Sequence, residues 1–98
     1  MMVRQGDLLI NRVEKLPTGK KKPRKNRILA HGEVTGHHHE LTAGEVFEIG
    51  KRVFFTTKKN TTLTHQEHGH IEFEPGTYEV TRQREYTARK KRAVYVRD

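Results

Sequence analysis

The chain has 98 residues, with 20 Lys and Arg against 12 Asp and Glu, which gives a formal net charge of +8 at pH 7. This length predicts a single domain over residues 1–98 and excludes a second hydrophobic core. Cysteine is absent, so disulfides are excluded, and we expect a reducing, cytoplasmic location. No apolar run is long enough for a signal peptide or a membrane span.

Short alternating or β-branched runs follow one another along the chain. They predict strands at 7–13, 27–30, 37–41, 45–49, 52–57, 70–73, 77–87 and 93–96. Gly, Pro and Asn separate these runs at intervals of about 8 to 12 residues. The pattern predicts an all-β fold, either a small β-barrel or a β-sandwich. The stretch YTARKKRAV could add a short helical turn near the C-terminus.

Residues 17–27, PTGKKKPRKNR, carry six Lys or Arg and two prolines. Charge repulsion and the fixed φ angles of proline predict a flexible basic loop here. Either this loop is a solvated hairpin tip, or it is an arm that neutralises phosphates together with the second basic run, ARKKR at 88–92.

The positive charge indicates a polyanionic partner, and nucleic acid, RNA more than DNA, is favoured over membrane because no amphipathic helix is present. A homo-oligomer stays open, and so does the alternative that the charges only keep the protein soluble. The candidate nucleic-acid contacts are Lys20, Lys21, Lys22, Arg24, Lys25, Arg82, Arg84, Tyr86, Arg89, Lys90, Lys91 and Arg92.

All seven histidines fall between His31 and His70. Alternate residues of a strand share a face, so His37 and His39 in GHHHE form a potential bidentate ligand. THQEHGH offers a second pair, His65 and His68, with Glu67 between them. If the two pairs converge, they could bind Zn, Ni, Fe or Mn.

The same residues also permit chemistry without a metal. His37 and His65 could act as general base and general acid on a phosphodiester, with Glu67 as a further catalytic carboxylate. A third alternative is that the histidines are polar residues on a solvated face. We therefore expect a nucleic-acid-binding protein that cleaves phosphodiesters, either with a metal or through histidine alone. The competing classes are a metal protein that acts on or senses a small molecule, and a binding module without catalysis.

The segment PGTYEVTRQREY alternates over its whole length. Its even-numbered residues, from Tyr78 and Val80 to Arg82, Arg84 and Tyr86, share one face. That face could stack bases and neutralise phosphates. We favour the interpretation in which Tyr78 and Val80 fill the core while Arg82 and Arg84 emerge at the rim and pair with acidic neighbours.

Taken together, RQGDLLI, GEVTGHHH, LTHQEHGHIEF and PGTYEVTRQREY resemble a family of short bacterial and phage-type proteins without an established activity. The family pattern is GHxH, THxEH and PGxYxVxxQREY. The resemblance implies importance for Gly36, His37, His39, Thr64, His65, Glu67, His68, Gly76, Tyr78, Gln83, Arg84, Glu85 and Tyr86.

A second similarity is to the cupins, small metal-binding β-barrels. The order of Gly32, His37, His39, Glu45 and Gly50 imitates their first motif. The spacing from His39 to Glu45 is longer than that motif has.

Overall fold

The computed structural model of the chain describes residues 2–31 and 36–83. Its elements are ten strands: β1 (Met2–Gln5), β2 (Leu8–Arg12), β3 (Lys21–Pro23), β4 (Ile28–His31), β5 (His38–Leu41), β6 (Glu45–Ile49), β7 (Arg52–Thr57), β8 (Thr61–Thr64), β9 (Ile71–Phe73) and β10 (Gly76–Arg82). The all-β prediction is confirmed. In the described part of the chain, no helix is long and apolar enough to cross a membrane.

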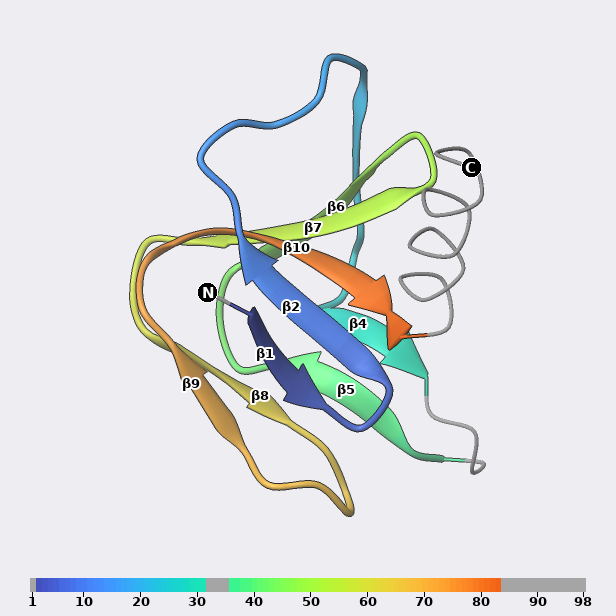
Figure 1. Cartoon of the computed structure of the whole chain (residues 1–98), viewed down its shortest axis with the longest axis vertical. Helices are drawn as coiled ribbons and strands as arrows, with labels where there is room; N and C mark the ends of the chain where they lie inside the picture. Colours follow the sequence, from blue (N-terminus) through green and yellow to red (C-terminus); the bar gives the residue numbers. More distant parts are fainter. Residues whose placement is uncertain (1, 32–35, 84–98) are drawn as a thin grey trace, which may run out of the picture.

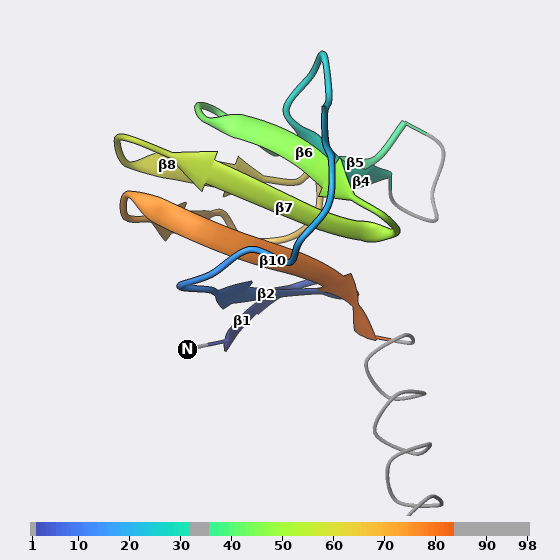
Figure 2. The same ribbon diagram turned by 90° about the horizontal axis from the view of Figure 1, so that it is seen from above.

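The strands form two antiparallel sheets (Figure 1). The larger sheet has the order β1-β2-β10-β7-β6-β3, and the smaller has the order β4-β5-β8-β9. In the view from above, β4 and β5 lie behind β6 and β7 (Figure 2). The last strand, β10, pairs with both β2 and β7, so it joins the N-terminal hairpin to the rest of the larger sheet.

One hydrophobic core holds the two sheets together. Its aromatic centre is Phe55, Phe73 and Tyr78, whose ring centroids lie 4.8 to 5.4 Å apart. Aliphatic residues from both sheets surround these rings: Leu8, Ile10, Leu29, Leu41, Val46, Leu63 and Val80. Tyr78 and Val80 are buried, which confirms their predicted place in the core.

A second, smaller cluster lies on the opposite face of the larger sheet. It contains Phe47, Ile49 and Phe54, against which Val13 and Leu16 pack. Phe47 and Phe54 are cross-strand partners, and both belong to this second cluster. Their neighbours Val46 and Phe55 are also cross-strand partners, but their side chains belong to the main core. The period of two along β6 and β7 therefore supplies apolar residues to both faces.

The strands differ from the predicted ones at β1, β3, β8 and β10. The pattern predicted no strand at β1 or β8, and it predicted a loop over all of 17–27, where β3 pairs with β6 at the edge of the larger sheet. A proline is tolerated there because an edge strand leaves one side without ladder hydrogen bonds. The strand expected at 77–87 ends at Arg82. The strand expected at 93–96 and the C-terminal helical turn lie outside the described residues.

Candidate functional site

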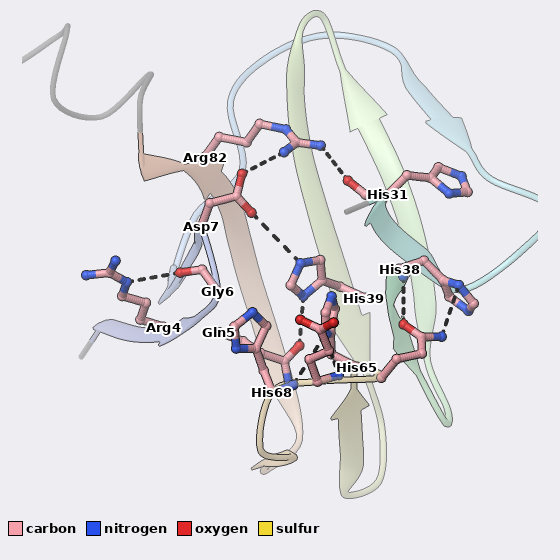
Figure 3. A network of polar contacts seen from close by, with 12 residues as sticks. Arg4, Gln5, Gly6, Asp7, His31, His38, His39, His65, His68 and Arg82 are labelled. Carbon is pink, nitrogen blue, oxygen red and sulfur yellow. Dashed lines mark hydrogen bonds and ion pairs between the residues drawn. The ribbon is translucent and has the colours of Figure 1, made fainter. Parts of the chain in front are cut away.

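His39, His65 and His68, from separate parts of the chain, lie side by side (Figure 3), and His37 lies next to His65. The ring centroid of His65 is 4.4 Å from that of His39, 4.6 Å from that of His68 and 5.6 Å from that of His37. We call these four residues the histidine cluster. The structure thus brings together the two pairs that the sequence suggested as metal ligands.

Alternation along β5 decides which of the three consecutive histidines points inward. His39 is only 2% exposed. His38 turns to the other face, where its Nε2 lies 3.1 Å from a carboxylate oxygen of Glu40. His37 precedes the strand and reaches His65 from there. The second pair comes from the turn that follows β8, and there His65 is 9% exposed while His68 is exposed.

A buried glutamine sets the tautomer of His39. The side-chain amide of Gln5 donates from Nε2 to the carbonyl oxygens of Leu63, at 3.0 Å, and Gly69, at 2.8 Å. Since carbonyl oxygens only accept, Oε1 of Gln5 must face Nδ1 of His39, 2.8 Å away. His39 therefore donates from Nδ1, and in its neutral form Nε2 carries a lone pair.

That lone pair faces a carboxylate. Nε2 of His39 is 3.9 Å from Oδ1 of Asp7, whose other oxygen accepts a 2.8 Å hydrogen bond from Nη1 of Arg82. Asp7 lies in the β1–β2 turn next to Gly6, where φ is +59°. A Cβ at Gly6 would lie 2.9 Å from Nε2 of His68 and 3.3 Å from Cε1 of His39. Only glycine lets this turn approach the two rings so closely.

His65 has the opposite tautomer. Its Nδ1 accepts hydrogen bonds from the backbone N–H groups of Glu67, at 3.0 Å, and His68, at 3.3 Å. Neutral His65 therefore carries its proton on Nε2. The carboxylate of Glu67 lies 3.5 Å from Nδ1 of His37. In their neutral forms, His39 thus offers the lone pair of Nε2, and its neighbour His65 offers an N–H group at Nε2.

Burial keeps the two central rings neutral. It lowers the pKa of His39 to about 4, and the adjacent His65 adds to this effect while Asp7 opposes it. Burial also lowers the pKa of His65, with His68 and His37 contributing in the same direction. At neutral pH, protons therefore do not compete for the lone pair of His39.

Residues 4–83 match a family model described as a domain of unknown function, DUF8820. The chain belongs to this family. No curated protein and no solved structure matches the chain.

The DUF8820 match spans the whole histidine cluster together with Gln5, Asp7 and Arg82. Arg84, Tyr86, Arg89, Lys90, Lys91 and Arg92, which were candidates for nucleic-acid binding, lie beyond the match and outside the described residues. Glu45, the carboxylate of the cupin-like pattern, is exposed at the start of β6, in the other sheet from His39.

The remaining basic candidates divide into two groups. Lys20, Lys21, Lys22 and Lys25 are exposed, in and beside the edge strand β3. Two arginines have structural partners instead. Arg24 pairs with Glu48 at 3.1 Å and donates to two backbone carbonyls, while Arg82 pairs with Asp7. Among these candidates, the four lysines can therefore meet a polyanion without breaking an internal ion pair.

Sequence reasoning missed Gln5, Gly6 and Asp7 as parts of the site. They stand in the segment RQGDLLI, which carries the family resemblance. A glutamine, a glycine and an aspartate immediately before an apolar strand indicate a tight polar turn. Nothing in that pattern indicates which histidine the turn will contact.

Proposed function

We propose that the histidine cluster binds a divalent transition metal ion, with Zn, Ni, Fe and Mn as the candidates. The observation that carries this proposal is the bare Nε2 of His39 facing the Asp7 carboxylate at 3.9 Å. Two acceptors at this distance repel unless a cation or a donor lies between them. A metal ion can bond to both atoms, since two bonds of about 2.1 Å at a tetrahedral angle hold their ligand atoms about 3.4 Å apart, and a small movement of the side chains closes the difference.

The surroundings of His39 support a ligand role. Metal-binding histidines commonly donate their second ring nitrogen to an oxygen acceptor, which fixes the ring and its tautomer. Gln5 is such a partner for His39. Asp7 keeps Oδ1 available because Arg82 binds Oδ2. His68, whose ring lies against Gly6 and is stacked with that of His39, would be the third ligand.

The cluster would have to adjust around the ion. Among residues 2–31 and 36–83, no three His, Asp or Glu side chains already direct their ligand atoms at one point. His68 is exposed, so its ring can turn about its side-chain bonds. His65 is a poorer ligand, because backbone N–H groups occupy its Nδ1. It would then lie beside the ion as a hydrogen-bond donor.

We propose a phosphodiester of nucleic acid, RNA in particular, as the substrate. The net charge of +8 and the exposed lysines around β3 favour a polyanion. We also propose a cytoplasmic location, in which cellular RNA would have access to the site. The bound ion would stabilise charge on the phosphate or activate a water molecule.

A second candidate is cleavage by histidine chemistry without a metal. It is favoured by the opposite tautomers of His39 and His65, which place a proton acceptor beside a proton donor. The low pKa and the burial of His39 weaken this candidate, because a general base works best with a pKa near the working pH and must reach its substrate.

Elemental analysis of the untagged protein, followed by titration of the metal-free protein with each metal, tests the main proposal. We expect one metal ion per chain, a loss of affinity of about tenfold or more in Asp7→Asn and His68→Ala, and no change in His70→Ala. His70 is an exposed histidine of the same turn. If no metal binds the wild-type protein, or if His70→Ala is as damaging as His68→Ala, the proposal is wrong.

A ribonuclease assay with and without chelator, between pH 5 and 8, separates the two candidates. Activity that chelator abolishes and added metal restores supports the metal. Activity that survives chelator but is lost in His65→Ala supports the metal-free mechanism. If the wild-type protein cleaves RNA neither with nor without chelator, the proposed substrate is wrong, whatever the metal content.

A further inference from the structure

A cavity of about 440 Å³ lies between the two sheets. This volume falls in the range of small-molecule sites, about 300 to 1,000 Å³. No residue of the histidine cluster lines the cavity. Arg82 connects the two, because its guanidinium donates to Asp7 of the site and to the carbonyl of His31 at the cavity (Figure 3). The lining residues are Leu8, Arg24, Asn26, Ile28, Leu29, Ala30, His31, Lys51, Val53, Val80 and Arg82.

The floor of the cavity is aliphatic. Six of the lining residues carry only hydrocarbon side chains, contributed by β2, β7 and β10 of the larger sheet and by β4 of the smaller. Leu8, Leu29 and Val80 are buried, whereas Ala30 and Val53 are partly exposed. A flat apolar group can lie against such a floor without leaving a polar atom unpaired.

The rest of the lining is rich in hydrogen-bond donors, and none of the described residues that line it carries a carboxylate. The guanidinium of Arg24 is held by Glu48 and two backbone carbonyls through Nε and Nη1. Oδ1 of Asn26 accepts a hydrogen bond from the backbone of Ile28, so its amide hydrogens point elsewhere. These fixed donors suit a ligand with several acceptor atoms, and a plain hydrocarbon chain would leave them unpaired.

Lys51 gives the cavity its uncompensated charge. Arg24 and Arg82 are neutralised by Glu48 and Asp7. Lys51 is exposed in the β6–β7 turn and forms no ion pair with any residue that the structure describes. The cavity thus combines an aliphatic floor, a set of neutral and charged donors, and one positive charge at its rim.

We propose that this cavity binds a single nucleotide, with the base against the aliphatic floor and the phosphate at Lys51. A nucleobase supplies the flat body and the ring acceptors, and the phosphate supplies the negative charge. The nucleotide is either a free mononucleotide or one residue of single-stranded RNA. Binding of a residue of single-stranded RNA rests on the proposed function. The RNA backbone would then lie next to Arg82, on the side away from the histidine cluster.

Backbone NMR titration of the full-length chain, with chelator present, tests this site independently of any metal. The probes are AMP, adenosine, inorganic phosphate and a tetranucleotide RNA. We expect saturable AMP shifts at Leu29, Val53 and Val80, with weaker binding of adenosine and of phosphate. Saturable shifts with the tetranucleotide at these residues assign the site to RNA; shifts with AMP alone assign it to free nucleotides.

Two variants and a matched control complete the test. Lys51→Glu should weaken AMP binding at least about fivefold, and Ala30→Leu should weaken it by filling the floor. Lys58→Glu makes the same charge change at the other end of β7 and should leave affinity unchanged. The inference is overturned if AMP causes no saturable shift at the cavity, if adenosine binds as tightly as AMP, or if Lys58→Glu is as damaging as Lys51→Glu.

Discussion

Replacing Gln5 by methionine tests the arrangement around His39 most directly. Methionine has a similar size but neither donates nor accepts strongly, so the change removes three hydrogen bonds while the packing stays nearly filled. Two carbonyl oxygens, those of Leu63 and Gly69, lose a donor, and Nδ1 of His39 loses its acceptor. Because Gln5 is only 2% exposed, water cannot readily replace these partners.

The expected loss follows from the cost of each group left unpaired. A buried donor or acceptor without a partner costs about 1 to 3 kcal/mol, and one of the three bonds is only partly buried. We therefore expect Gln5→Met to lower the free energy of unfolding by about 3 kcal/mol, measured by urea denaturation. The control is Gln66→Met, which removes an exposed bond to the backbone of His38 and should change stability by less than about 1 kcal/mol.

Two results would refute this reasoning. One is a loss in Gln5→Met no larger than that in Gln66→Met. The other concerns the tautomer, which ¹⁵N chemical shifts of the imidazole report. If wild-type His39 carries its proton on Nε2, the assigned orientation of the Gln5 amide is wrong, and the argument for a metal ligand fails with it.

Three further predictions concern acidity, the β1–β2 turn and the core. Because the folded-state pKa of His39, about 4, lies below its unfolded value of 6.5, the unfolded chain binds the proton first; stability should fall by up to about 3 kcal/mol as pH drops from 6.5 to 4. The ring of His39 in metal-free protein should stay neutral at pH 5 by NMR, and a midpoint near 6.5 contradicts this. Gly6→Ala should destabilise the protein more than Gly50→Ala, since both glycines have positive φ but only a Cβ at Gly6 meets the His68 ring; equal urea midpoints would contradict the close approach. Tyr78→Phe removes a 2.8 Å hydrogen bond to a backbone carbonyl four residues earlier and keeps the ring, so we expect a loss of about 1 kcal/mol, and a loss above 3 kcal/mol would point to a packing role for the hydroxyl.

Local periodicity predicted much of the fold. The strands expected at 45–49 and 52–57 agree with β6 and β7, because there alternation and β-branched residues coincide. Sequence reasoning missed β1 and β8, whose residues Met2–Gln5 and Thr61–Thr64 have little apolar alternation. Pairing with β2, and with β5 and β9, holds these segments as strands, and the pattern within a four-residue segment does not contain its partner.

The residues of the candidate site were also predicted only in part. The HxH spacing correctly separated His38 from its neighbours, and the concentration of histidines indicated a common centre. Gln5 and Asp7 could not be assigned to it, because their place depends on β10 carrying the N-terminal hairpin to its position in the larger sheet. Arg82 was predicted to pair with an acidic neighbour, and it does pair with one. That partner, Asp7, is 75 residues away in the sequence and could not be named in advance.

The position of β10 also determines when the site can form during synthesis. The hairpin with Gln5 and Asp7 is made well before β10, and among the strands that the structure describes β10 is both its neighbour in the larger sheet and the last to be made. Until Gly76–Arg82 has emerged, β2 has no partner on that side, and His39 and His65 lack the turn that completes their surroundings. A nascent chain stalled before β10 would therefore have every histidine of the cluster and still no assembled site.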